Sequence, residues 1–481
     1  MEQYRKFTKD VLLIGLVSIF ISIQQIILIP LLTKTLGVGS YGIWSSIMLT
    51  VELISLIASL GLGYAIIRFF AKVNKKEIQS GFSSILLTSS ITGFLLSIFL
   101  FLISDLIAIY IFKDIASSFF IKLASIMVLV TTLNVIIVNF FNALRKTYSY
   151  SFLLILQSLG ELLLVFYLVI KGFGLGGAIL GSLLAKLVVF GLGTLAIRFS
   201  IKLKKPDFSL LKKYIYYSLP IAPLALFSWI LHSSDIYVIG LFRGTSEIGI
   251  YSLVYSLSKV MFLFMGPIGL MLYPAISKAW DHKKFVEAKN YLSYSMKYFL
   301  LFAIPTATGL IVLANPLIQI ISTKEFLSGY LLFPFIAVGL LLFKAAEVFM
   351  YILTSKKQTK LISKIYGFGA LMNIILNFVF IPFFGMYGAA FTTFLTYLSI
   401  LLIMFSKAYT QFKFNLNFKF MIKSVIASVI MGVVIYLFHI TSLVMLLSIM
   451  LLGAIIYFLA IILMKGITRK ELSFFYNFIK R

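Results

Sequence analysis

Fourteen apolar stretches of about 20 residues or more follow one another along this chain. A helix of that length crosses the roughly 30 Å hydrocarbon core of a bilayer, and only helices and closed barrels satisfy their own backbone there. A barrel would show alternating segments of about 10 residues, which this sequence lacks. The stretches therefore predict an all-α polytopic membrane protein. We place the spans at 11–33, 41–66, 81–103, 116–140, 150–170, 174–197, 214–241, 248–276, 292–314, 328–353, 362–382, 385–405, 419–439 and 442–464.

The first stretch has some features of a signal peptide. Arg5, Lys6 and Lys9 precede it, but it is too long and runs into Pro30-Leu-Leu-Thr-Lys34 without a small-residue cleavage site. We expect it to remain as the first span.

The basic residues predict the orientation. When the N-terminus is placed in the cytoplasm, 33 of the 42 Lys and Arg residues fall in cytoplasmic segments and only 5 fall in outer loops. This is the bias of the positive-inside rule, and it predicts a multi-pass protein of the cytoplasmic membrane with both termini inside. The formal net charge of +27 follows from this bias and from anionic headgroups nearby, so no nucleic-acid partner is expected.

Two polar turns recur at nearly the same spacing. Gly37–Ser45 reads Gly-Val-Gly-Ser-Tyr-Gly-Ile-Trp-Ser, and Gly244–Ser252, 207 positions later, reads Gly-Thr-Ser-Glu-Ile-Gly-Ile-Tyr-Ser. Gly174-Leu-Gly-Gly-Ala178 returns after 211 positions as Gly385-Met-Tyr-Gly-Ala389. Such periods indicate a duplicated architecture, here two six-span lobes related by a pseudo-twofold axis along the membrane normal. The predicted domains are an N-lobe at 11–197, a cytoplasmic linker at 198–213, a C-lobe at 214–405, and spans thirteen and fourteen at 419–464.

The sequence carries no enzyme signature. It has no cysteine, no paired-histidine metal spacing and no glycine-rich phosphate loop before a soluble helix. All loops are short, which leaves no room for a soluble catalytic domain. We therefore expect neither an enzyme nor a bound metal or other cofactor.

Ionisable residues deep inside spans are costly and are candidates for function. Candidates for substrate binding in a cavity are Lys259, Lys186, Glu52, Asp235 and Lys344, and candidates for binding a coupling ion are Asp235, Glu52, Glu161 and Glu347. Glu52 and Lys259 are equivalent in the two repeats, since they lie 207 positions apart. They predict either an ion pair that latches the lobes, or a cavity cation for an anionic substrate with a carboxylate that releases it.

The other charges divide into local and unassigned ones. Lys344 and Glu347 are i,i+3 neighbours on one helix face, which favours a local pair. Lys186 has no obvious partner nearby in sequence and is the better ligand candidate. Asp235 is either a structural hydrogen-bond acceptor or a coupling-ion site.

Several motifs resemble Wzx-type flippases. In the first half these are Leu31-Leu-Thr-Lys-Thr-Leu-Gly37, Tyr41-Gly42 and Leu60-Gly-Leu-Gly63; in the second half they are Lys213-Tyr-Ile-Tyr-Tyr-Ser-Leu-Pro220, Trp229-Ile-Leu-His-Ser-Ser-Asp235, Gly240-Leu-Phe-Arg-Gly244, Ile248-Gly-Ile-Tyr-Ser252, Leu272-Tyr-Pro274, Asn377 and Gly388-Ala389-Ala390. These flippases are oligosaccharide-lipid translocases of the multidrug/oligosaccharidyl-lipid/polysaccharide exporter superfamily, and the resemblance covers nearly the whole chain.

The resemblance implies a MATE-like pair of lobes around a central cavity. It further implies that a polyprenyl-(pyro)phosphate-linked oligosaccharide is bound on the cytoplasmic side and released outside by alternating access, for surface polysaccharide or glycan assembly. The implied partners are this substrate, membrane lipids and glycan-assembly enzymes, and a proton or sodium gradient is the implied energy source. A monomer is sufficient, because one chain contains both lobes.

Two alternatives stay open. One is an ion-coupled multidrug or toxic-compound antiporter, which needs acidic cavity residues such as Glu52 and Asp235. The other is a membrane polysaccharide polymerase or ligase, which resembles many-span proteins with a sizeable catalytic outer loop. Our central hypothesis is that Lys186 and Lys259 contact the substrate phosphate.

Overall fold

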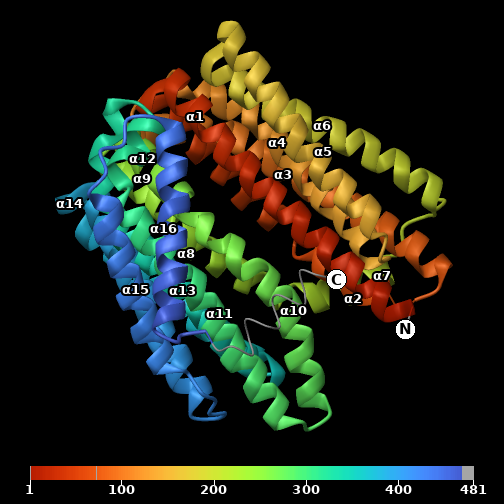
Figure 1. Ribbon diagram of the computed structural model, residues 1–481. Coiled ribbons are helices and arrows are strands. Elements are labelled where there is room, and N and C mark those ends of the chain that lie inside the picture. The colour runs from red at the N-terminus through yellow and green to blue at the C-terminus, as the bar shows by residue number, and fades with distance from the viewer. Residues whose placement is uncertain (1, 72, 468–481) are drawn as a thin grey trace. The chain divides into compact units, whose positions relative to one another are not determined.

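The computed structural model describes residues 2–71 and 73–467, and within these ranges the side chains of all but residues 2–9, 11, 12 and 264–273. The basic side chains near the N-terminus and the segment 468–481, both expected in the cytoplasm, lie outside this description. Every regular element in the described ranges is helical (Figure 1). The elements are α1 (Glu2–Ala58), α2 (Leu62–Phe69), α3 (Lys75–Ile107), η1 (Ala108–Phe112), α4 (Ser117–Ala143), α5 (Thr147–Leu168), η2 (Val169–Phe173), α6 (Gly174–Ser200), α7 (Phe208–Ser218), α8 (Ala222–Phe242), α9 (Thr245–Ser258), η3 (Lys259–Met261), α10 (Phe262–Asp281), α11 (Phe285–Val312), α12 (Ala314–Ile321), η4 (Lys324–Leu332), α13 (Phe333–Ser355), α14 (Thr359–Tyr409), α15 (Phe418–Tyr436) and α16 (Leu443–Leu463).

Ten helical stretches in the described residues are long and apolar enough to cross a membrane. Three of them contain a glycine with positive φ and a non-helical backbone: Gly37, Gly172 and Gly385. The 51-residue α14 is about 75 Å long, more than twice the hydrocarbon core, so each broken stretch holds two expected spans. Together α9, η3 and α10 cover the expected span at 248–276. The fourteen expected spans are thus mainly helical, although turns at 59–61 and 219–221 interrupt those expected at 41–66 and 214–241. The prediction of an all-α, multi-pass membrane protein is confirmed.

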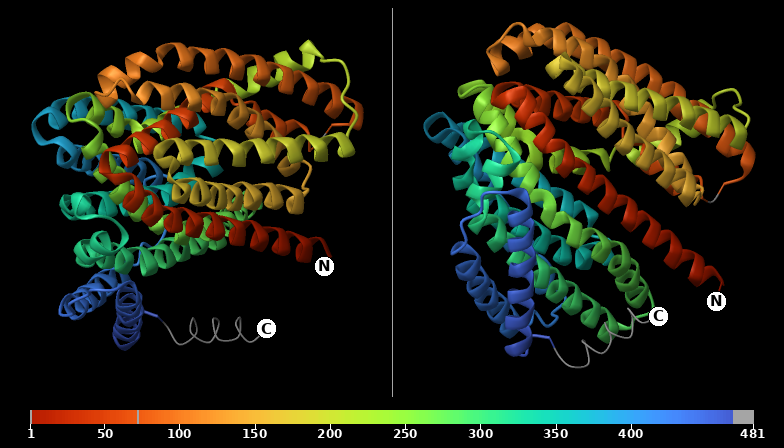
Figure 2. Two further views of the ribbon diagram at one scale, coloured as in Figure 1. Left: turned by 90° about the horizontal axis from the view of Figure 1, so that it is seen from above. Right: turned by 45° about the horizontal axis from the view of Figure 1, so that its top comes forward.

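The chain divides into two compact units. The first unit comprises Met1–Leu253 and Tyr366–Ala389, and the second comprises Val254–Ile365 and Ala390–Arg481. In the first unit α3, α4, α5 and α6 pack alongside α1, with α2 and α7 at one end (Figures 1 and 2). In the second unit α15 packs against both α11 and α16. The lobe boundaries expected from the repeats stay a prediction.

The two equivalent polar turns contact each other within the first unit. A Cβ added to Gly42 would lie 2.1 Å from the carbonyl oxygen of Thr245, and one added to Gly249 would lie 2.1 Å from that of Val38. Gly42 and Gly249 are equivalent in the two repeats, and so are Val38 and Thr245, because each equivalent pair is 207 positions apart. The two close approaches are therefore the same contact made from each repeat. Glycine permits such close helix approach because it has no side chain. In the same register, the Ser45 hydroxyl donates to the Ser252 hydroxyl over 2.9 Å.

The break in α14 is held by two charged side chains, one from the residue after α8 and one from the first turn of α9. Arg243 Nη2 donates to the carbonyl oxygen of Pro382 over 2.9 Å, at the C-terminal end of the first half of α14. Glu247 Oε2 accepts from the backbone N–H of Met386 over 2.7 Å, just after Gly385. A cation at a helix C-terminus and an anion at a helix N-terminus both complement the helix dipole, so the pair fixes both sides of the break.

Among the described residues, the corresponding break at Gly172–Gly174 has no such pair of charged side chains. The positions equivalent to Arg243 and Glu247 are Leu36 and Ser40. A Cβ added to Gly172 or Gly174 would meet nothing within 4 Å. The two repeats therefore share the break but differ in how it is held.

The segment after α6 contains the short helix α7, which packs against α2 and α3 within the first unit. Asp207 caps α7 by accepting from the N–H groups of Ser209 and Leu210 over 2.9 and 3.2 Å. The Ser84 hydroxyl of α3 donates to the carbonyl oxygen of Asp207 over 2.9 Å and accepts from its N–H over 2.7 Å. Tyr214 is 1% exposed and would lie 2.6 Å from a Cβ on Gly81. These contacts hold the helix against α2 and α3.

Acid is expected to loosen the start of α7. The N–H of Leu210 and then the hydroxyl of Ser209 donate to Asp207 and hold the pKa of its carboxyl below the ordinary value. Because this pKa is lowered on folding, its stabilising contribution is present above the ordinary pKa of about 3.9 and is lost as the pH falls through the lowered value. Amide exchange of 208–213, corrected for the intrinsic rate, should therefore speed up between about pH 4 and pH 2.

The matched control is Asp207→Asn, which keeps a capping oxygen but does not titrate. Its corrected exchange should not depend on pH in this range. An equal acid response in the wild type and Asp207→Asn would show that another group loosens the helix.

Candidate functional site

Lys259 lies where a long helix is interrupted. After Ser258 the chain forms the three-residue 3₁₀ helix η3 and then continues as α10. A 3₁₀ turn inside a helix often marks a functional hinge. The Lys259 ammonium lies 5.1 Å from the ring centroid of Tyr255, and the Tyr255 and Tyr397 hydroxyls are 2.9 Å apart. The half-buried Lys259 thus presents a cation beside two aromatic residues of the second unit.

Lys344 forms the local pair that its spacing predicts. Its ammonium donates to Glu347 Oε1 over 2.6 Å, and the two side chains are 16% and 19% exposed. The same ammonium lies 4.2 Å from the ring centroid of Phe262. This geometry favours a structural pair over a substrate ligand.

Removing one partner of the Lys344–Glu347 pair should lower the free energy of unfolding more than removing both partners. Glu347→Gln leaves a largely buried ammonium without its counter-charge and should lower the free energy of unfolding by about 3 kcal/mol. The double variant Lys344→Met/Glu347→Gln leaves no charge and should be close to the wild type. Thermal midpoints of the purified variants in detergent measure both. A double variant less stable than Glu347→Gln would contradict this account.

Asp235 is a buried carboxylate surrounded by hydrogen-bond donors. It is 1% exposed, accepts from Asn377 Nδ2 over 2.5 Å and also accepts from the Tyr251 hydroxyl. Next to it, the Ser234 hydroxyl donates to Asn373 Oδ1 over 2.8 Å. These neutral donors fit the structural-acceptor reading of Asp235, and its use as a coupling-ion site stays a prediction.

The amides that complete this cluster escaped sequence reasoning. In the sequence, Asn377 stands out only as part of a family motif, and nothing singles out Asn373. Both are fully buried and lie four residues apart in an apolar span, so they share one helix face. That spacing of two amides in an expected span is the signal that could have found them.

A second polar layer lies in the first unit and contains Lys186. Glu161 Oε1 of α5 accepts from the Ser182 hydroxyl of α6 over 2.9 Å. Asn134 Nδ2 of α4 donates to the carbonyl oxygen of Lys186 over 2.9 Å. The Ser158 hydroxyl donates to Gln24 over 3.2 Å. Four helices therefore contribute polar side chains to one region of the bundle.

Within this layer the half-buried Lys186 ammonium has no hydrogen bond or ion pair to any described residue. Asn134 Oδ1 is buried and also has no described partner. An unpaired cation at this depth is costly unless a counter-charge reaches it. Lys186 is thus the candidate whose surroundings most favour an anionic ligand.

Glu52 belongs to the first unit and Lys259 to the second, so their pairing stays a prediction. Glu52 is exposed. Two residues earlier in α1, the Thr50 hydroxyl lies 2.8 Å from the Tyr237 hydroxyl, so α1 and α8 meet near Glu52.

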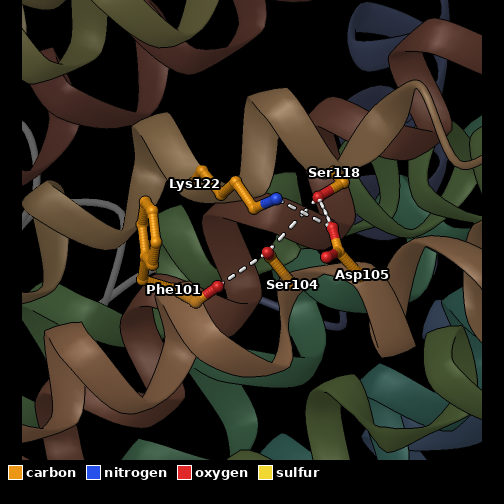
Figure 3. Close-up of polar contacts among 5 residues, drawn as sticks. All are labelled: Phe101, Ser104, Asp105, Ser118 and Lys122. Carbon is orange, nitrogen blue, oxygen red and sulfur yellow. Dashed lines mark hydrogen bonds and ion pairs between the residues drawn. The ribbon is translucent and has the colours of Figure 1, made fainter.

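Lys122 belongs to a separate cluster at the ends of α3 and α4. Its ammonium lies 2.9 Å from Asp105 Oδ1, which also accepts from the Ser118 hydroxyl (Figure 3). The Lys122 and Asp105 side chains are 35% and 54% exposed. An exposed pair of this kind contributes little to stability. We interpret it as a surface pair and not as part of the candidate site.

A family model described as "Polysaccharide biosynthesis protein" matches residues 31–330. Among curated relatives, the probable low-salt glycan biosynthesis flippase Agl15 of Haloferax volcanii is 26% identical over 46% of both chains. The probable flippase AglR of the same organism is 25% identical over 50% of both chains. The alignments thus span about half the length of these relatives. An uncharacterized membrane protein of Methanocaldococcus jannaschii, MJ1375, is 24% identical over 76% of this chain and 89% of its own.

Two kinds of solved structure are similar to most of the chain. The lipid II flippase MurJ in an inward closed conformation has a TM-score of 0.80 and 19% identity, covering 98% of this chain and 100% of its own. An inward-facing multidrug resistance MATE family transporter of the MOP superfamily has a TM-score of 0.65 and 14% identity, covering 83% of this chain and 98% of its own. At these identities the likeness shows the fold, and it confirms the MATE-like architecture expected from the sequence.

Proposed function

Because the chain belongs to the family of polysaccharide biosynthesis proteins, we propose that it is a flippase for a lipid-linked oligosaccharide. The substrate is a polyprenyl-(pyro)phosphate-linked glycan, and alternating access carries it across the cytoplasmic membrane for glycan assembly. Both termini lie in the cytoplasm, as the distribution of basic residues predicts. The names of the two Haloferax relatives support the flippase reading.

The observation that carries this proposal is the half-buried ammonium of Lys186, which has no hydrogen bond or ion pair to the part of the chain that the structure describes. A pyrophosphate loses hydration when it enters a membrane protein, and this loss is very unfavourable unless charges inside compensate it. Lys186 supplies one such charge in the first unit, and Lys259 supplies another in the second. A neutral or cationic substrate would gain nothing from either ammonium.

An ion-coupled multidrug antiporter is the second candidate. It is supported by the MATE-like fold and by Asp235, a carboxylate that is 1% exposed. In an antiporter this buried carboxylate would be the site for the coupling proton or sodium ion. In the flippase the same residue would couple glycan movement to a proton or sodium gradient. The polymerase or ligase reading gains no support from the structure's described outer turns.

The deciding experiment uses proteoliposomes that contain the wild-type protein. One arm measures translocation of a fluorescent polyprenyl-pyrophosphate oligosaccharide, with protein-free liposomes as the control. The other arm measures export of an organic cation driven by a proton or sodium gradient. Glycolipid translocation without cation export is the expected result. Cation export without translocation of any glycolipid would make the protein an antiporter.

A further inference from the structure

The segment from the end of α6 through α7 is a basic stretch of the first unit. Lys202, Lys204, Lys205 and Lys212 are all exposed. Apolar side chains lie exposed among them: Leu203 is 48% exposed, Phe208 67% and Tyr216 84%. Within 198–219 the sequence has one acidic residue, Asp207, and its carboxylate is engaged by the N–H groups at the start of α7. The exposed surface is therefore both cationic and apolar.

This surface is held by a fixed support. Tyr214 lies against the rings of Phe69 and Phe70, and the Lys213 ammonium lies 5.0 Å from the Phe69 ring centroid. The Ser218 hydroxyl donates to the carbonyl oxygen of Leu60 over 2.9 Å. The inner side of α7 is thus packed against other residues of the first unit.

The outer side of α7 is a stripe with helical spacing. Leu211, Tyr214 and Ser218 are buried. Phe208, Lys212 and Tyr216 recur at every fourth residue on the other side and are exposed. Residues four apart lie above one another on a helix, so these three form a continuous outward stripe. Together with Lys202, Leu203, Lys204 and Lys205 we call it the linker surface.

The position of the linker surface in the chain sets its depth. It follows the end of one membrane-spanning helix, α6, and precedes the next, α8, so both of its ends lie at the same face of the membrane. A short segment of this kind lies in the headgroup region, where a helix with lysines and aromatic rings binds in the plane of the interface. Lysines there are attracted to anionic headgroups, and the attraction is strong for clusters of four or more.

We propose that the linker surface binds the phosphodiester headgroups of anionic lipids, with Leu203, Phe208 and Tyr216 inserted at the headgroup–acyl boundary. The lysines account for the anion and the apolar side chains account for the lipid. A soluble phosphate would contact only the lysines. An acidic protein would also bind the lysines, but it would leave the apolar side chains in the headgroup region without an apolar partner. The docking of α7 on α2 and α3 then couples lipid binding to the position of the connection between the lobes.

The test uses a single cysteine, which has no background because the chain contains none. Leu203→Cys is labelled with a polarity-sensitive fluorophore, and the protein is placed in nanodiscs with increasing fractions of phosphatidylglycerol in phosphatidylcholine. We expect a blue shift that saturates with phosphatidylglycerol and is reversed by 0.5 M salt, because interfacial charge attraction is screened. Replacing Lys202, Lys204, Lys205 and Lys212 by glutamine should raise the half-saturating fraction more than tenfold or abolish the shift.

The matched control removes four exposed lysines of the second unit, Lys357, Lys360, Lys364 and Lys407, also by glutamine. It changes the net charge equally and should leave the shift unchanged. An equal shift in pure phosphatidylcholine would overturn the proposal. A shift produced by soluble glycerol phosphate in neutral discs would also overturn it. The same holds if the four control substitutions abolish the shift as fully as the four linker substitutions do. The readout requires no transport, so it stands or falls independently of the proposed function.

Discussion

A Lys259→Ala variant should fold normally and lose translocation of the lipid-linked oligosaccharide by about 30-fold or more. The ammonium lies at the helix interruption of η3 and 5.1 Å from the Tyr255 ring, where it faces a substrate phosphate in our proposal. Removing one partner of a desolvated charge pair costs roughly 2–5 kcal/mol, which corresponds to this loss of rate. The initial rate in proteoliposomes measures it. Lys186→Ala should show a loss of the same order, because its ammonium has no ion pair among the described residues and the substrate phosphate is its proposed counter-charge.

Two further variants make this result specific. Lys259→Arg keeps the charge and should retain a substantial part of the rate, although the two side chains are not fully equivalent. Lys344→Met/Glu347→Gln removes a charge pair that the structure shows to be satisfied locally and should translocate at nearly the wild-type rate. If Lys259→Ala and Lys186→Ala both translocate like the wild type, the site assignment is wrong while the proposed function stands.

Gly42→Ala and Gly249→Ala should each prevent stable folding. The added Cβ would lie 2.1 Å from a backbone carbonyl oxygen in either case, and a backbone cannot move aside as a flexible side chain can. Overpacking typically costs about 1–3 kcal/mol, and a backbone clash belongs at or above the upper end. The yield of monodisperse protein and its thermal midpoint in detergent measure the effect.

Gly191→Ala is the control, since a Cβ there meets nothing within 4 Å and alanine favours the helix. It should match or exceed the wild type in stability. Near-normal thermal midpoints for Gly42→Ala and Gly249→Ala would show that the two turns separate easily and do not depend on this close approach.

The fold could be predicted because its signals are local in the sequence. A span needs only its own apolar residues, and the two turns at Gly37–Ser45 and Gly244–Ser252 reveal the repeat by resemblance alone. The Lys344–Glu347 pair was equally accessible, because one helix turn fixes its geometry. The sequence did not show that the two turns touch, since contact between them depends on how closely their helices cross.

The candidate site could be predicted only in part. Asp235 was identified by its depth, but Asn377, 142 positions away, could not be assigned to it without knowing that α14 passes beside α8. That Lys186 has no ion pair among the described residues likewise depends on how α1, α4 and α5 pack around α6. The partners of Glu52 and Lys259 remain a prediction, because spacing establishes their equivalence and not their separation.

The reciprocal approach of Gly42 and Gly249 has the form of an isologous contact, in which the same patch is used on both sides of a twofold axis. In a homodimer of a six-span ancestor, one glycine codon would serve both halves of such an interface, and one mutation would damage it twice. After fusion into a single chain the halves mutate separately, so Leu36 and Ser40 could diverge from Arg243 and Glu247. The two glycines cannot diverge in this way, because each one lies against a backbone carbonyl group of the other half and a side chain there would clash with it.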